Sequence, residues 1–213
     1  MASQQRFDPS MLRLIAITDS LRDGIPGLVS RAEQAVSGGA TMLQLRLPDE
    51  TPRTLVEAAR ALRASLPHVP LLVNERADVA LAASAQGVHV NVDGVSAEAL
   101  RRIAPPGFII GASVGDDAEC ARAVAADYVG IGPVFAAPRS TGSGGALGLE
   151  RFSEIARRCG IPAVAIGGIS AANAGSVIGA GASGVAVISA LFSSADPMQA
   201  ARDLRAALDA SGS

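Results

Sequence analysis

The chain has 213 residues, of which 49% are apolar and 18% charged, and its formal net charge is −2 at pH 7. This composition is typical of a folded globular domain and argues against an intrinsically disordered chain. No basic cluster marks a nucleic-acid-binding face, and no apolar run reaches the roughly 20 residues that cross a bilayer. We therefore predict a globular protein that binds neither nucleic acid nor a membrane.

The domain boundaries follow from the two ends of the sequence. Residues 1–10 lack the apolar core of a signal peptide and are predicted to be a disordered leader, and residues 11–210 are predicted to form one domain. The two cysteines, Cys120 and Cys159, have no metal-ligand spacing and fall in predicted helices. We expect them to be free thiols in a reducing cytoplasm.

Short apolar runs rich in Val, Ile and Leu recur along the chain at the spacing of strand–helix units. Because these runs are continuous, they are predicted to be parallel strands that are covered on both faces. They are Leu12–Thr18, Met42–Leu47, Leu71–Asn74, Val88–Val92, Phe108–Val114, Tyr128–Phe135, Ala163–Gly167 and Val185–Ser189. A doubly wound open sheet could use the same units, but eight strand–helix pairs favour a single (β/α)₈ (TIM) barrel of the α/β class.

Segments with helical periodicity separate the runs. In the first of them Leu28, Ala32 and Ala35 fall on one face, and in the second Pro52 suits the first helical turn. The predicted helices are Ile25–Ser37, Pro52–Ala64, Ala77–Ala83, Ala97–Ile103, Asp117–Ala126, Leu149–Arg158, Ala172–Ala180 and Pro197–Leu208.

The ends of the seventh and eighth strands suit an anion. The seventh ends in Gly167-Gly168, where the missing Cβ atoms let backbone N–H groups approach a ligand, and the eighth ends in Ile188-Ser189. Barrels of this kind often hold a phosphate at these two loops. The alternative interpretation is two tight turns that require positive φ.

Polar residues also follow the other strands, and loops at this end of a barrel carry its chemistry. The candidates are Asp19, Gln44, Arg46, Asn74, Glu75, Arg76, Asn91, Asp93, Ser113 and Arg139. Gln44 and Arg46 alternate along one strand and therefore point the same way, into the barrel mouth. The Asn74-Glu75-Arg76 segment suits a hydrated Mg²⁺ with a diphosphate, or else a helical first turn with a surface ion pair.

Three further features remain, and two of them are open to two interpretations each. His68 lies at the predicted bottom of the barrel and is expected to be structural. His89 lies inside a strand and faces either the mouth or the helix layer, where a hydrogen-bonded core histidine is the simpler expectation. The Thr141–Gly145 segment is either a lid over the ligand or a linker.

Nearly the whole chain resembles the thiamine phosphate synthase family, which includes a TenI-type branch of thiazole tautomerases. The segments that carry the resemblance are LRLIAITD, GATMLQLR, VNERADVALA, GVHV, IIGASV, ADYVGIGPVF, AIGGIS and GASGVAVISALF, in order and at suitable spacing. No single motif is decisive, and the specificity lies in their ordered co-occurrence.

The resemblance implies a thiamine-biosynthesis transferase that joins hydroxymethylpyrimidine diphosphate to a thiazole phosphate, with loss of pyrophosphate and the help of Mg²⁺. It implies that Gln44 holds the pyrimidine, that Arg46 holds the diphosphate, and that Asn74 and Ser113 line the same ligand. The thiazole phosphate is then expected at Gly168, Ile188 and Ser189.

The diphosphate side departs from the family pattern. Pro48 stands where the pattern has a lysine, and Ala137-Pro138-Arg139-Ser140 replaces a Thr-x-Thr-Lys type segment. Glu75 replaces one metal-binding aspartate, while the second falls opposite Gly94, with Asp93 one position early. We expect Glu75 and Asp93 to be the Mg²⁺ ligands, and Arg76 and Arg139 to replace part of the missing charge.

These departures leave alternatives to the synthase. A tautomerase would need only the intact thiazole-phosphate side, but the histidine expected in that branch is Gly115 here. A catalytically weak thiazole-phosphate or thiamine-phosphate binding protein is a second alternative, and an unrelated phosphosugar isomerase a third. We expect small phosphorylated partners and a cytoplasmic location; the sequence leaves the oligomeric state open, a homo-oligomer included.

Overall fold

The computed structural model describes residues 7–91, 94–136 and 145–211. Eight parallel strands form a closed barrel in the order β1 to β8, and β8 pairs back to β1. The strands are β1 (Leu14–Ile17), β2 (Met42–Leu45), β3 (Leu71–Asn74), β4 (Gly87–Val90), β5 (Ile109–Val114), β6 (Tyr128–Ile131), β7 (Ala163–Ile166) and β8 (Gly184–Val187). The predicted (β/α)₈ barrel is confirmed.

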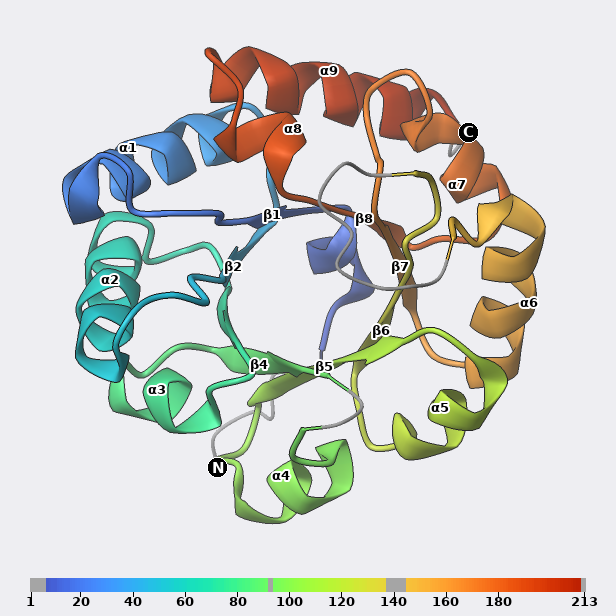
Figure 1. The fold of residues 1–213 in the computed structure, drawn as a ribbon, viewed down its shortest axis with the longest axis horizontal. Helices are drawn as coiled ribbons and strands as arrows, with labels where there is room; N and C mark the ends of the chain where they lie inside the picture. The colour runs from blue at the N-terminus through green and yellow to red at the C-terminus, as the bar shows by residue number, and fades with distance from the viewer. Residues whose placement is uncertain (1–6, 92–93, 137–144, 212–213) are drawn as a thin grey trace.

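The helices form a ring around the strands, as the view in Figure 1 shows. They are α1 (Gly24–Ser37), α2 (Pro52–Ser65), α3 (Ala77–Ala82), α4 (Ala97–Ile103), α5 (Asp117–Arg122), α6 (Gly148–Cys159), α7 (Ala174–Gly179), α8 (Ser189–Phe192) and α9 (Pro197–Ala210). The short α8, which follows β8 directly, is absent from the sequence prediction because four residues are too few to show a helical period. In the described parts of the chain, no helix has both the length and the apolar character needed to span a bilayer.

Alternation along the strands divides the apolar residues into two layers. On β1, Leu14 and Ala16 pack against the surrounding helices, whereas Ile15 and Ile17 point into the barrel. The inner layer also contains Met42, Leu72, Ile109, Tyr128, Val164 and Ala186. Because the inner apolar residues fill the barrel from its N-terminal end, the remaining space opens at the C-terminal ends of the strands.

The N-terminal segment closes the opposite end of the barrel. A 3₁₀ helix, Pro9–Leu12, is capped by the side chain of Asp8 and leads into β1. The Phe7 ring stacks on the Tyr128 ring with a centroid distance of 6.3 Å. Phe7, which the sequence analysis assigns to a disordered leader, therefore packs against the inner layer of the barrel.

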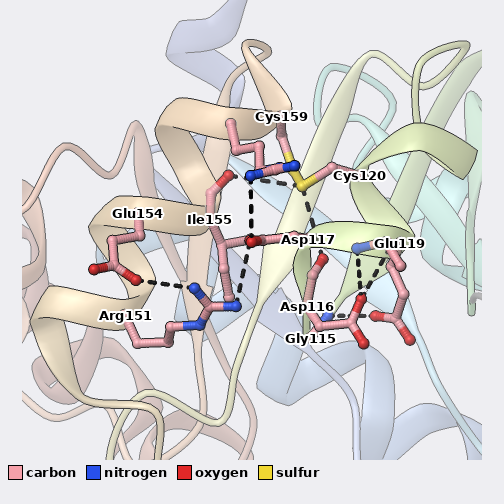
Figure 2. A network of polar contacts seen from close by, with 11 residues as sticks. Gly115, Asp116, Asp117, Glu119, Cys120, Arg151, Glu154, Ile155 and Cys159 are labelled. Atoms are coloured by element: carbon pink, nitrogen blue, oxygen red, sulfur yellow. Dashed lines mark hydrogen bonds and ion pairs between the residues drawn. A yellow bond between two sulfur atoms is a disulfide. The ribbon is translucent and has the colours of Figure 1, made fainter.

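The expectation of free thiols is wrong, because Cys120 and Cys159 form a disulfide (Figure 2). Cys120 lies on α5 and Cys159 ends α6, and the packing of these neighbouring helices brings their Cα atoms to 4.9 Å. Asp117 on α5 also forms an ion pair with Arg151 on α6. The two cysteines are 39 residues apart in the sequence, so their proximity could not be predicted from local pattern. It depends on the contact between two successive strand–helix units.

The disulfide is expected to stabilise the fold. Closing a loop of this length restricts the unfolded chain, so replacing both Cys120 and Cys159 by serine should lower the free energy of unfolding by about 2–4 kcal/mol. Urea unfolding with and without dithiothreitol measures the effect. The double variant serves as the control, because the reductant should leave its unfolding curve unchanged. Two reactive thiols in the unreduced, unfolded wild type would contradict the disulfide.

Candidate active site

A cavity of about 390 Å³ opens at the C-terminal ends of the strands. Its floor is apolar, with Ile15, Ile17 and Val164 among the lining residues. Its walls carry the polar residues Gln44, Arg46, Glu50, Asn74, Glu75, Arg76, His89, Asn91 and Ser113. Most of the polar candidates that the sequence analysis places at strand ends therefore meet in one space.

The side chains that follow β2 are held by neighbouring strands. Gln44 is only 4% exposed, and its Nε2 donates to Asn74 Oδ1 at 2.7 Å. The backbone N–H of Arg46 donates to Thr18 Oγ1 at 2.8 Å, while the Thr18 hydroxyl donates back to the Arg46 carbonyl at 3.0 Å. Within the described residues, the Arg46 guanidinium has no ion pair, so its charge is available to a ligand.

The segment after β3 combines a carboxylate at the mouth with an internal ion pair. Glu75 has a φ of 62°, a backbone conformation that few non-glycine residues adopt and that often marks a functional site. Its carboxylate accepts a hydrogen bond from Asn91 Nδ2. Arg76 donates to both carboxylate oxygens of Asp78, at 2.8 and 2.5 Å, so part of its charge is already neutralised.

His89 lies between Tyr128 and Ser113 in the barrel interior. Its Nδ1 is 3.0 Å from the Tyr128 hydroxyl oxygen, and its Nε2 is 3.0 Å from Ser113 Oγ. Burial lowers the pKa of His89 to about 4, so the ring is neutral at pH 7. Burial also raises the pKa of Tyr128, and the Asp127 carboxylate adds to this shift. His89 is thus both a hydrogen-bonded core histidine and part of the cavity wall.

Two glycines make room for this pair of rings. A Cβ at Gly111 would lie 2.4 Å from the Tyr128 ring and 2.5 Å from His89 Nδ1. A Cβ at Gly130 would lie 3.1 Å from His89 Cε1. Gly111 lies on β5, between the two strands that carry the rings, and Gly130 lies on β6 two residues after Tyr128, so the backbone itself forms the slot in which His89 and Tyr128 meet.

The loop after β7 has the positive φ values that the alternative interpretation requires, whereas Ile188 after β8 has a φ of −110°. Gly167 and Gly168 have φ values of 92° and 65°. A Cβ at Gly167 would lie 2.5 Å from Pro133, and one at Gly168 would lie 2.7 Å from the Ala136 carbonyl oxygen. The close approach of the segment after β6 is therefore enough to require glycine here, and a phosphate at this place stays a prediction.

The other predicted residues near these loops differ in position. Ile188 lines the cavity, together with Ile166 at the end of β7. Ser189 is exposed and begins α8. Asp93 and Arg139 lie outside the described residues, as does all of the Thr141–Gly145 segment except Gly145.

Sequence reasoning missed Tyr128 and left Asn91 without a role. Tyr128 begins an apolar run and is the only tyrosine of the chain, so nothing local distinguishes it from a core residue. Asn91 follows His89 by two positions and therefore points to the same side of its strand. The spacing of two residues could have indicated that Asn91 and His89 lie on the same side. The role of Asn91 could not be inferred from it, because its partners Ser113 and Glu75 belong to other strand–helix units.

Comparison with known proteins shows which family the chain belongs to. Residues 14–191 match the model of the family described as thiamine monophosphate synthase. The chain belongs to this family. The thiamine-phosphate synthase of Xanthobacter autotrophicus is 43% identical over 204 residues, covering 94% of this chain and 97% of that protein. That of Methanoculleus marisnigri is 47% identical over 178 residues, covering 82% and 84%.

Solved structures lead to the same family. The thiamine phosphate pyrophosphorylase of Pyrococcus furiosus superposes with a TM-score of 0.86 and is 35% identical, covering 96% of this chain and 99% of that one. A 3-hexulose-6-phosphate synthase superposes with a TM-score of 0.72 at 22% identity, covering 92% and 99%, and this likeness shows only a shared fold.

The cation composition of the chain limits which side chains can meet a phosphorylated ligand. It contains no lysine, and all 18 of its basic residues are arginines. Any positive charge that a phosphorylated ligand meets on a side chain must therefore come from arginine, apart from a protonated histidine. Of the described arginines, only Arg46 and Arg76 line the cavity, and Arg76 is paired with Asp78.

The buried neutral His89 should make the fold sensitive to acid. The unfolded chain binds a proton at this residue below pH 6.5 and the folded chain only below about pH 4, so the free energy of unfolding should fall by about 3 kcal/mol as the pH drops between these values. Denaturant unfolding of the wild type and of the His89→Gln variant isolates this contribution from that of the carboxylates.

The His68→Gln variant is the matched control, since it makes the same substitution at an exposed histidine. Equal slopes in the wild type and the His89→Gln variant would contradict a lowered pKa of His89.

Proposed function

We propose that this chain is a thiamine-phosphate synthase, a transferase that condenses hydroxymethylpyrimidine diphosphate with a thiazole phosphate. The observation that carries the proposal is the meeting of Gln44, Arg46, Asn74 and Ser113 in one cavity of a chain that matches the family model over residues 14–191. A thiazole tautomerase has less support, because Gly115 stands where its histidine is expected and both nitrogens of His89 are already hydrogen-bonded.

Arg46 is the residue that we assign to the departing diphosphate. In the reaction, the bond between the pyrimidine methylene carbon and the diphosphate oxygen breaks, and its electron pair leaves with the diphosphate. The thiazole nitrogen then forms the new bond to the same carbon. A fixed guanidinium stabilises the charge that grows on the leaving oxygen, and its planar fork suits two phosphate oxygens. The hydrogen bonds between Arg46 and Thr18 hold the backbone from which this guanidinium extends.

Gln44 is the residue that we assign to the pyrimidine ring. It is buried, and its amide is oriented by the hydrogen bond to Asn74, so its free carbonyl oxygen can accept from a ring amine. The apolar floor below excludes water from the carbon at which the bond breaks. Gln44 therefore positions the reacting methylene relative to Arg46.

Mg²⁺ is a cofactor that the residues at the mouth can accommodate. Mg²⁺ usually takes one or two carboxylates and completes its shell with water and substrate phosphate oxygens. Glu75 supplies one carboxylate, and Gly94 supplies none where the family pattern has an aspartate. No group of three or more metal-ligating side chains occurs in the described parts of the chain. When bound, the ion would neutralise charge on the diphosphate, and Glu75 and the predicted ligand Asp93 would hold it.

The thiazole phosphate is proposed to bind at Gly168, Ile188 and Ser189, with Gly167 shaping the loop. Support comes from the position of these residues at the ends of β7 and β8, beside the cavity wall formed by Ile166 and Ile188. The cytoplasmic location and a homo-oligomeric state stay predictions.

The proposal is tested by supplying the purified chain with both phosphorylated precursors and Mg²⁺. We expect thiamine phosphate and pyrophosphate to form in equal amounts, which can be followed by thiochrome fluorescence and a pyrophosphate assay. If no product forms at high protein concentration while calorimetry still detects thiazole-phosphate binding, the protein is a binder and the proposal is wrong.

Arg46 should be needed for turnover far more than for folding. The Arg46→Ala variant is expected to lose about 10²–10³-fold in kcat/KM, because it removes a cation from the developing charge. Arg46→Lys should recover only part of the loss, since an ammonium cannot reproduce the guanidinium fork. Steady-state kinetics measure both variants.

Arg102→Ala is the matched control, because Arg102 is an exposed residue of α4 whose one ion pair among the described residues is with Glu98. An Arg46→Ala variant with wild-type kinetics would remove Arg46 from the site.

A further inference from the structure

A continuous series of hydrogen bonds runs from the barrel interior to its mouth. It joins Tyr128 on β6 to His89 on β4 at 3.0 Å, and His89 to Ser113 on β5 at 3.0 Å. Ser113 Oγ then donates to Asn91 Oδ1 at 3.1 Å, and Asn91 Nδ2 donates to the Glu75 carboxylate. We call these five residues the relay. The roles assigned above use Glu75 and Ser113 but leave Tyr128, His89 and Asn91 without a function.

The carboxylate at the outer end determines every proton in the relay. An ionised Glu75 can only accept, so Asn91 must present its amide nitrogen to Glu75 and its oxygen to Ser113. Ser113 therefore donates its one proton to Asn91. Having no second proton to give, Ser113 must accept from Nε2–H of His89.

The inner end is determined in the same way. His89 is 8% exposed, and the relay gives it no carboxylate partner, so a second, charged N–H on the ring would be costly. With its single proton on Nε2, the ring accepts at Nδ1 from the Tyr128 hydroxyl. All four hydrogen bonds thus point outward, from Tyr128 to Glu75.

The surroundings hold this arrangement in place. Tyr128 is 1% exposed, and its ring is stacked on Phe7. Gly111 leaves too little room for any larger residue beside the two rings. The relay therefore lies in a tightly packed slot at its inner end and is exposed only at Asn91 and Glu75.

We propose that Tyr128, His89 and Asn91 are positioning residues that fix the hydroxyl proton of Ser113 and the orientation of the Glu75 carboxylate. With its proton held by Asn91, Ser113 offers the ligand a lone pair and selects an N–H group of the substrate over a phosphate oxygen. The carboxylate of Glu75 is left with one oxygen free toward the mouth. The inference rests on the proposed function for its effect on turnover, but the arrangement of protons itself does not.

The first test reads the histidine protons directly. The chain has only two histidines, so long-range ¹H–¹⁵N spectra of the ¹⁵N-histidine-labelled full chain at pH 7 contain two ring systems. His89 should show a protonated Nε2 and an unprotonated Nδ1, while the exposed His68 should average between tautomers. The His68→Gln variant assigns the signals. A protonated Nδ1, or averaging at His89 like that at His68, would overturn the relay even in an active enzyme.

The second test separates positioning from folding by kinetics. Tyr128→Phe keeps the ring that stacks on Phe7 but removes the donor to Nδ1, and Asn91→Ala changes an exposed residue that should not be needed for folding. Each is expected to lower kcat by about 10-fold with little change in KM, the loss of roughly one buried hydrogen bond. Wild-type kcat in both variants would overturn the positioning role.

Conservative substitutions sharpen the outcome. A glutamine at position 89 can place an N–H near the site of Nε2, whereas an asparagine is too short, so His89→Gln should retain more kcat than His89→Asn. Asn91→Asp should keep the acceptor for Ser113 but oppose a second carboxylate to Glu75, and should be worse than Asn91→Ala. If the wild type forms no thiamine phosphate, the proposed function fails, and the tautomer of His89 still decides the relay.

Discussion

Closure of an eight-stranded parallel sheet is the constraint on which the rest of this molecule depends. Because the ring is closed, alternate residues of every strand must share one interior, whatever their distance along the chain. Apolar side chains fill its N-terminal end, where Phe7 packs on this inner layer and stacks on Tyr128. Polar side chains from β2 to β5 are therefore left at the C-terminal end, where they can satisfy one another.

Among the described residues, few positively charged side chains line this cavity. Without a single lysine, the chain can offer a diphosphate only arginines and, if it binds one, a metal ion. The pairing of Arg76 with Asp78 leaves Arg46 as the less neutralised of the two described arginines at the cavity. The diphosphate site proposed above would therefore rely on the geometry of one guanidinium and one carboxylate, Glu75, more than on several cationic side chains.

The fold could be predicted from the sequence because each strand–helix unit carries its own apolar pattern. Gln44 and Arg46 could be assigned to the mouth for the same reason, since alternation along one strand is local. The disulfide could not be predicted from the sequence, because Cys120 and Cys159 come together only when α5 packs on α6. The pairing of His89 with Tyr128 depends likewise on strand register, which no stretch of β4 or β6 contains by itself.

Asn91 shows how the departures at this site fit together. Glu75 stands where the family pattern has an aspartate, and its side chain is one methylene longer. A longer side chain has more rotamers, so fixing its carboxylate in one orientation costs more conformational entropy. The hydrogen bond from Asn91 restricts it, and the same amide holds the proton of Ser113. Asn91, an exposed side chain, thereby connects Glu75, which is proposed to lie near the diphosphate, to Ser113, which is proposed to line the pyrimidine site. The orientation of the Asn91 amide follows from Glu75, because an ionised carboxylate has no proton to donate and must accept from Nδ2.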